Sequence, residues 1–123
     1  MSKRVLVVDD EPNIVMSLEF LMRRAGFEVA VARNGREALD ALEGTPPDLL
    51  LLDVMMPEFD GYEVCERVRS RAEWGQTKII MLTARGRDIE RERGLSLGAD
   101  AYVTKPFSTR DLVEQVKRML GVG

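Results

Sequence analysis

Apolar runs along the chain predict five buried strands. Each run is short and bounded by polar or turn-forming residues, which is typical of strands rather than helices. The runs are Val5–Val8, Glu28–Ala32, Leu49–Leu52, Lys78–Leu82 and Ala101–Val103. The third run consists of leucines only, so we expect it at the centre of a parallel sheet, buried on both faces. The second run has less apolar bulk and is expected at an edge.

Between the runs, apolar residues recur at three- and four-residue spacing, which predicts helices. The first helix is expected from Pro12 to about Arg24, with a core stripe of Ile14, Leu18, Leu21, Met22 and Ala25. Further helices are expected at about 36–43, 61–71 and 85–97, and a last one, capped by Ser108 or Thr109, runs to about Leu120. Alternating strands and helices predict an α/β fold, a parallel sheet covered on both faces.

Polar side chains follow four of the five predicted strands. Asp9 and Asp10 come directly after the first strand, Asp53 after the third, Thr83 after the fourth and Lys105 shortly after the fifth. The carboxyl ends of parallel strands meet at one edge of the sheet, where ligands of such folds bind. We therefore expect these five side chains to lie close together.

The chemistry of this set points to phosphoryl transfer. Three carboxylates in one pocket repel one another, and a hard divalent cation such as Mg²⁺, bound by oxygen ligands, relieves that repulsion. Lys105 is expected to pair with Asp53, an attraction of about 4 kcal/mol at ~4 Å and an effective dielectric constant of ~20, before desolvation. A hydroxyl and an ammonium can donate hydrogen bonds to the oxygens of a phosphoryl group. A carboxylate can be the nucleophile that accepts this group. Taken singly, each residue could instead be a helix cap or a solvated loop residue. Because such residues follow four strands whose ends are expected to meet, a shared functional site is the favoured interpretation.

Composition narrows the class of protein. A chain of 123 residues is expected to form one domain, and a net charge of −3 gives no reason to expect direct contact with nucleic acid. Histidine is absent, which excludes a phosphohistidine of the chain's own and histidine-based general base catalysis. Cys65 is the single cysteine and no apolar run is long enough to span a membrane. We expect a soluble, cytoplasmic domain.

Several short motifs are together typical of one family. They are Asp9-Asp10, Asp53 followed by Met56-Pro57 and Asp60-Gly61, Thr83-Ala84, Gly98-Ala99-Asp100, and Lys105-Pro106-Phe107. In this order and at these spacings they resemble the receiver domain of bacterial two-component response regulators, over about Arg4 to Leu120. The resemblance implies a flavodoxin-like, three-layer (βα)5 fold with strand order 2-1-3-4-5.

The resemblance also implies roles for the acidic residues. Asp53 would accept a phosphoryl group from a sensor histidine kinase or a phosphotransfer protein. Asp9, Asp10 and Asp53 would hold Mg²⁺, together with the backbone carbonyl of Met55. Such a receiver catalyses its own phosphorylation and dephosphorylation and is not expected to be a turnover enzyme.

Further roles follow from the same resemblance. Thr83 and Lys105 would contact the phosphoryl oxygens, and the Lys105–Pro106 peptide bond would be cis. Thr83 and the aromatic residue Tyr102 would form the switch that alters a surface of the fourth helix, the fifth strand and the fifth helix. A downstream protein target would read this surface.

Two groups of residues are candidate partner surfaces. Met16 and Phe20 fall off the apolar stripe of the first helix and are expected to be exposed; they are either scattered surface residues or a docking surface for the kinase. Arg85, Arg87 and Arg91 offer positive charge to an acidic partner, or are merely a solvated face.

Three positions depart from the receivers that dimerise through the fourth helix, fifth strand and fifth helix. Ser96 and Ala101 stand where acidic residues are common, and Gln115 where a basic one is common. A monomer or a weak homodimer through that surface is therefore expected. The chain ends at Gly121-Val122-Gly123, so residues 1–123 are expected to be a single receiver domain without an output domain, either stand-alone or excised.

Other functions remain open at this point. A haloacid-dehalogenase-type aspartyl-phosphate phosphatase uses similar residues, but it needs a second aspartate two positions after its nucleophile, where this chain has Met55. A flavin-binding module would need a hydroxyl-rich phosphate loop where this chain has Asp9-Asp10-Glu11. The third alternative is a binding module that works without phosphorylation.

Overall fold

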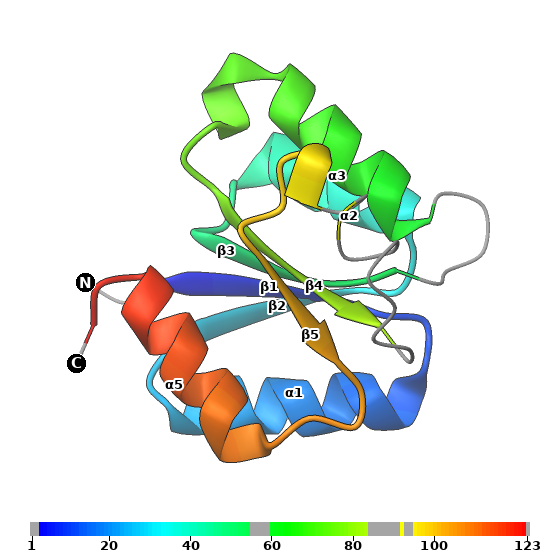
Figure 1. The fold of residues 1–123 in the computed structure, drawn as a ribbon. Helices are drawn as coiled ribbons and strands as arrows, with labels where there is room; N and C mark the ends of the chain where they lie inside the picture. The colour runs from blue at the N-terminus through cyan, green and yellow to red at the C-terminus, as the bar shows by residue number, and fades with distance from the viewer. Residues whose placement is uncertain (1–2, 55–59, 84–91, 93–94, 123) are drawn as a thin grey trace.

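A five-stranded parallel sheet forms the middle layer of the molecule (Figure 1). The computed structural model describes residues 3–54, 60–83, 92 and 95–122. The strand order is β2-β1-β3-β4-β5, and every neighbouring pair is parallel. This order confirms the flavodoxin-like topology that the resemblance implied.

The strands lie within one residue of their predicted bounds. They are β1 (Arg4–Val8), β2 (Glu28–Ala32), β3 (Leu49–Asp53), β4 (Lys78–Thr83) and β5 (Ala101–Thr104). All residues of β3 are buried and this strand is central, whereas β2 lies at an edge, both as predicted. The prediction worked because a strand buried on both faces needs an uninterrupted apolar run.

Helices cover both faces of the sheet (Figure 1). Their bounds are α1 (Pro12–Arg24), α2 (Gly35–Gly44), α3 (Gly61–Ser70) and α5 (Thr109–Met119), with a 3-10 turn, η1 (Ala72–Trp74), after α3. Side chains of α1 and α5 pack on one face of the sheet, and those of α2 and α3 on the other. The helix expected at 85–97 falls largely outside the described residues.

Alternate residues of the strands face opposite layers. Leu50 and Leu52 of β3 belong to the core under α2 and α3, and Leu49 and Leu51 to the core under α1 and α5. Each leucine buried in this way contributes about 1.5–3 kcal/mol relative to an exposed one. The two cores therefore fix the register of β3, because a slip of one residue would exchange its two faces.

The predicted core stripe of α1 was partly wrong. The structure buries Val15, Leu18 and Met22 and leaves Ile14 and Leu21 partly exposed. Val15 was missed, so the buried face is rotated towards it, while Ile14 and Ala25 pack at the margin of the core and Leu21 lines a surface groove. α1 ends as expected, with the next glycine at a φ of 97° and the Phe27 N–H donating to the Met22 carbonyl.

Three helices in the described part of the chain begin with a capping side chain. Asn34, Asp60 and Ser108 each accept a hydrogen bond from the backbone N–H three residues later. The Asn34 side chain caps α2, and this helix begins one residue earlier than predicted. Ser108 takes the cap that the sequence had left open between it and Thr109.

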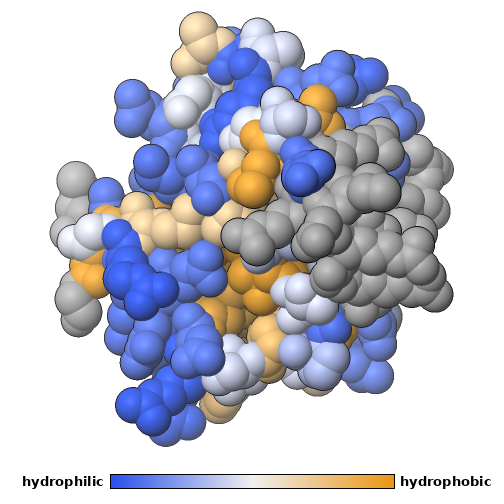
Figure 2. All heavy atoms as spheres, viewed as in Figure 1, coloured by the Kyte–Doolittle hydropathy of each residue, from blue (hydrophilic) through white to orange (hydrophobic). Residues whose placement is uncertain are grey.

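The surface is mostly polar over α5 (Figure 2). In the described part of the chain, none of the helices combines the length and apolar character needed to cross a membrane.

Candidate functional site

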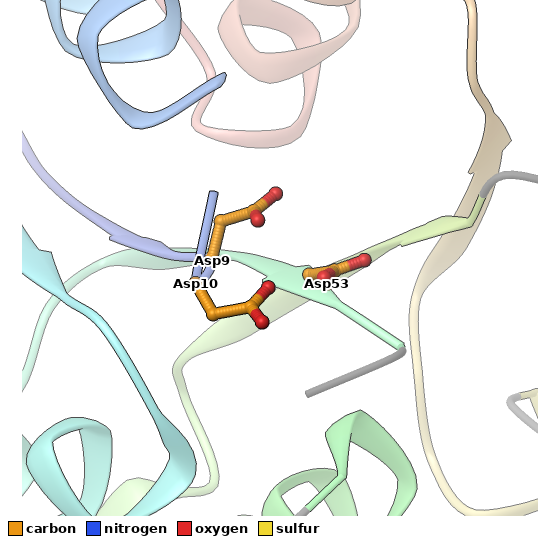
Figure 3. Close-up of side chains that lie close together, drawn as sticks. All are labelled: Asp9, Asp10 and Asp53. Carbon is orange, nitrogen blue, oxygen red and sulfur yellow. The ribbon is translucent and has the colours of Figure 1, made fainter. Parts of the chain in front are cut away.

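Three carboxylates converge where β1 and β3 end, as the sequence predicts. One oxygen each from Asp9, Asp10 and Asp53 lies within 4.8 Å of the other two. Asp9 and Asp53 are buried, with exposed fractions of 1% and 5%, whereas Asp10 is exposed. Figure 3 shows the Asp10 side chain extending towards Asp53. Two buried acids and one open to solvent form a pocket that a cation can enter.

The backbone holds Asp9 and Asp53 in place. The Asp9 N–H donates to the Ala32 carbonyl at 3.1 Å and so extends the pairing of β1 with β2. Asp53 is the last residue of β3 and lies opposite Leu82 of β4. The next residue, Val54, donates its N–H to the Leu82 carbonyl at 2.9 Å. Backbone pairing within the sheet therefore positions Asp53 at the end of β3 and Asp9 directly after β1.

Lys105 reaches into the carboxylate cluster from the loop after β5. Its Nζ lies 3.0 Å from Asp9 Oδ2 and 3.4 Å from Asp53 Oδ1. The predicted pairing with Asp53 is present, but the shorter contact is with Asp9, which the sequence did not suggest. The Lys105 N–H donates to the Thr83 carbonyl, and the Lys105–Pro106 bond is cis, as expected from the resemblance.

The carboxylates keep Lys105 protonated. Burial lowers the pKa of its ammonium, but the hydrogen bond with Asp9 and the charges of Asp53 and Asp9 outweigh burial, so that the pKa is raised. The three carboxylates and this one ammonium have a net charge of −2 when all are ionised. A divalent cation bound by oxygen ligands fits both the charge and the donor set.

Thr83 and Tyr102 occupy neighbouring strands near the cluster. Thr83 is the last residue of β4 and is 2% exposed, one residue beyond the position paired with Asp53. Tyr102 is partly buried and packs against the core under α2 and α3. It pairs with Met81, two residues before Thr83, so Tyr102 and Thr83 share one face of the sheet.

Gly61 lets α3 start against the backbone of Asp53. Its N–H donates to the Val54 carbonyl at 2.9 Å. A Cβ at Gly61 would lie 2.4 Å from the Asp53 carbonyl oxygen and 2.8 Å from Val54 Cα, closer than any side chain can be. This close approach was missed from the sequence, where the glycine itself was its only signal.

Arg69 of α3 holds the segment that leads into β5. Its Nε donates to the Gly98 carbonyl and its guanidinium also donates to Asp100 Oδ2, both at 2.8 Å. The same Asp100 oxygen accepts the Ile79 N–H of β4 at 2.8 Å. α3 therefore contacts the Asp53 backbone at one end and, near the other, the start of the strand that leads to Lys105. The sequence marked Asp100 but not Arg69.

The comparisons with known proteins agree with this geometry. The family model for the response regulator receiver domain matches residues 5–117. The chain belongs to this family. Receiver domains are signalling modules of two-component systems, generally not turnover enzymes, and they bind Mg²⁺ at an acidic pocket such as the one formed here.

Solved receiver domains superimpose over nearly the whole chain. The signal receiver domain of a signal transduction histidine kinase from Syntrophus aciditrophicus is 35% identical, with a TM-score of 0.91, over 98% of this chain and 91% of that chain. The BeF3-activated DrrB receiver domain, from a Thermotoga maritima protein, is 32% identical, with a TM-score of 0.90, over 98% and 99%. The chemotaxis protein CheY4 of Vibrio cholerae is 32% identical, with a TM-score of 0.91, over 97% and 99%.

Some expected residues of the receiver site lie outside the described part of the chain. They are Met55, whose carbonyl is an expected metal ligand, and Arg85, Arg87 and Arg91. Of the remaining surface candidates, Met16 is 68% exposed and Phe20 is 61% exposed, which confirms that they lie off the core.

Membership of the receiver family favours phosphorelay signalling over the phosphatase and flavin-binding alternatives.

Proposed function

We propose that this receiver domain accepts a phosphoryl group on Asp53 from a phosphohistidine of a sensor histidine kinase or phosphotransfer protein, in a reaction that requires Mg²⁺. The observation that carries the proposal is the position of Asp53. It is a buried carboxylate at a strand end, within 4.8 Å of two other acids and 3.4 Å from an ammonium. No catalytic histidine is needed, because the attacking group is the carboxylate itself.

The acids differ in how they can hold the metal. Asp9 Oδ1 accepts the Glu11 N–H at 3.0 Å, and Asp9 Oδ2 accepts from Lys105. Asp10, which is exposed, and Asp53 would therefore supply the principal side-chain oxygens, with the Met55 carbonyl as a further ligand by analogy with the family. Bound Mg²⁺ would neutralise charge on the phosphoryl oxygens.

The chain's own residues carry the transfer. The Asp53 carboxylate attacks phosphorus, the P–N bond to the donor imidazole breaks, and the new P–O bond makes an acyl phosphate, while the imidazole takes a proton from solvent. Lys105, kept protonated by Asp9 and Asp53, would pair with a phosphoryl oxygen, and Thr83 would donate its hydroxyl to another. Both groups are held at the ends of adjacent strands and need little reorganisation.

Phosphorylation would then act as a switch. The phosphoryl group adds a charge of about −1.5 to −2 beside Thr83 and Lys105. Movement of the Thr83 hydroxyl towards it would vacate space on the face that Tyr102 shares, and the partly buried Tyr102 ring is placed to enter that space. The altered surface would comprise the helix expected at 85–97, β5 and α5, where a downstream protein binds or a weak homodimer forms.

The kinase or phosphotransfer partner would dock beside α1. Met16 and Phe20 are large exposed apolar residues of that helix. Met16 also lines a pocket of about 260 Å³ together with Asp10, Val15 and Arg33. Because this pocket shares Asp10 with the metal site, a partner seated there would bring its phosphohistidine close to Asp53.

Intact mass measurement tests the proposal. Incubation with acetyl phosphate and Mg²⁺ should add one phosphoryl group, and a chelator or Asp53→Asn should abolish the gain. Asp40→Asn, at an exposed aspartate of α2, should still gain it. Phosphorylation of Asp53→Asn at an undiminished level would refute the assignment. Sustained turnover of a small phosphate ester such as p-nitrophenyl phosphate would favour the phosphatase alternative.

A further inference from the structure

A groove of about 360 Å³ runs between α1 and α5. Its apolar lining comes from Leu21 of α1, from Ala25 directly after that helix, and from Val113 of α5, all of them partly exposed. The groove uses none of the residues of the phosphoryl site. Apolar side chains at the base of a concave surface favour contact with another apolar group.

Positive charge surrounds the apolar base. Among the described residues, the charged lining of the groove consists of Arg24, Arg110 and Lys117 and one carboxylate, Glu114. The groove is thus basic on a chain whose net charge is −3. Glu114 pairs with Arg110 at 3.6 Å, and the ion pairs recorded within the described residues include neither Arg24 nor Lys117. Figure 2 shows hydrophilic side chains gathered over α5, in the lower left of the view.

A favourable interaction with the helix dipole explains the positions of only two of these three cations. Arg24 and Lys117 lie in the last turns of their helices, where cations interact favourably with the helix dipole. Arg110 is the second residue of α5, at the end where the dipole disfavours a cation, and its side chain is 87% exposed. The helix dipole therefore does not explain Arg110, whose only recorded benefit to α5 among the described residues is the exposed pair with Glu114, and this arginine adds positive charge to the groove.

We infer that the groove between α1 and α5 binds an acidic amphipathic segment of a partner protein. The apolar side of the segment would lie on Leu21, Ala25 and Val113, and its carboxylates would face Arg24, Arg110 and Lys117. A second copy of this chain fits poorly, because a symmetric contact would bring the two basic rims together. Nucleic acid would use the cations but not the apolar base.

Chemical-shift titration of the unphosphorylated, ¹⁵N-labelled chain tests this. The probe is a synthetic helical peptide with leucines along one face and glutamates on the others. Amides of residues 21–25 and 109–117 should shift at micromolar peptide. The same peptide with lysine in place of glutamate, and an acidic peptide with its leucines scattered, should each bind at least tenfold more weakly.

Matched variants separate the groove from general charge. Arg110→Gln with Lys117→Gln should weaken the acidic peptide at least tenfold, whereas Arg36→Gln with Lys78→Gln, at exposed cations outside the groove, should leave its affinity unchanged. The spectrum of each free variant reports whether it folds. If the double groove variant does not fold, Arg24→Gln, which also removes a cation of the groove, is measured in its place. Four outcomes would each overturn the inference. They are chemical-shift changes at other residues, equal losses of peptide affinity in both pairs of variants, no chemical-shift changes at millimolar peptide, and tighter binding of a single-stranded oligonucleotide at the same residues.

Discussion

Lys105 lies closer to Asp9 than to Asp53, the proposed phosphoacceptor. The Nζ is 3.0 Å from Asp9 Oδ2 and 3.4 Å from Asp53 Oδ1, and the lysine side chain is only 18% exposed. One ammonium therefore neutralises part of the charge on two buried acids at once. A metal ion and Lys105 would compete for the Asp53 carboxylate, while both would assist the incoming phosphoryl group.

Lys105→Met should separate these two effects. Removing a positive charge from the cluster should tighten Mg²⁺ binding at least fivefold, because a charge at ~4 Å contributes roughly 1 kcal/mol even in water and more at a largely buried site. The rate of phosphorylation by acetyl phosphate should fall tenfold or more, because a phosphoryl oxygen loses its partner. Calorimetry and intact mass measure the two quantities. Lys78→Met, at an exposed lysine of β4, is the control, and a phosphorylation rate unchanged by Lys105→Met would contradict the role of this residue.

Gly61→Ala should damage both stability and the site. The new Cβ would lie 2.4 Å from the Asp53 carbonyl oxygen, and backbone cannot move aside cheaply. We expect a loss of about 1–3 kcal/mol in the free energy of unfolding. Phosphorylation should slow tenfold or more because Asp53 is displaced.

Gly44→Ala is the matched control. Gly44 ends α2, and a Cβ there has no atom within 4 Å. It should stabilise the protein by up to about 1 kcal/mol. Urea unfolding measures both variants, and equal effects would show that the close approach at Gly61 carries no cost.

Buried Cys65 should make stability fall at alkaline pH. Burial raises the pKa of its thiol from the ordinary 9.0 to about 11; the charge of Arg69 opposes this, and those of Asp100 and Glu66 add to it. Between these two values the unfolded chain loses the proton first, so the folded state loses stability as pH rises from 9 to 11.

Cys65→Ala tests this pH dependence. At about 1.4 kcal/mol per pKa unit, the variant should show a decline smaller by about 2–3 kcal/mol over that range, measured by urea unfolding. The wild-type thiol should also react slowly with a disulfide reagent at pH 8, with the urea-unfolded chain as the fast-reacting control. Parallel stability curves for the two proteins would contradict the buried thiol's role.

The sequence predicts local features well and distant pairings poorly. Strand bounds came within one residue because each strand is a local apolar run between polar residues. The convergence of Asp9, Asp10 and Asp53 followed from topology alone, since parallel strands end at one edge. Residues that follow buried strands were therefore the most predictable part of the site.

Long-range partners have no such local signal. The Lys105–Asp9 contact spans 96 residues, and the Arg69–Asp100 contact spans 31. Nothing in the spacing of Arg69 on its own helix marks its partner, because the choice depends on how α3 lies across β4 and β5. The close approach of Gly61 to the Asp53 backbone was missed for another reason: a glycine after Asp60 suits an ordinary turn as well as a capped helix start.

Met16→Ser with Phe20→Ser should slow phosphotransfer from the cognate histidine kinase at least tenfold. Phosphorylation by acetyl phosphate should not change, because neither residue belongs to the carboxylate cluster. Leu95→Ser, at another exposed apolar residue, is the control and should leave both reactions intact. Equal transfer rates for the wild type and the double variant would show that Met16 and Phe20 are ordinary surface residues.

Thr83→Ala should uncouple the phosphoryl site from the distal surface. In the wild type, beryllofluoride with Mg²⁺ mimics the phosphoryl group and should shift amides both around Asp53 and along residues 84–104, because Thr83 moves and Tyr102 follows. Without the Thr83 hydroxyl, the shifts near Asp53 should persist and the distal shifts should be lost. Calorimetry should find Mg²⁺ affinity within about twofold of the wild type, since Thr83 is not a proposed ligand. Tyr102→Phe is the second comparison: it keeps the ring, so its distal shifts should survive even if the hydroxyl loses a partner. Distal shifts that persist in Thr83→Ala would refute the coupling, and so would wild-type shifts confined to the metal pocket.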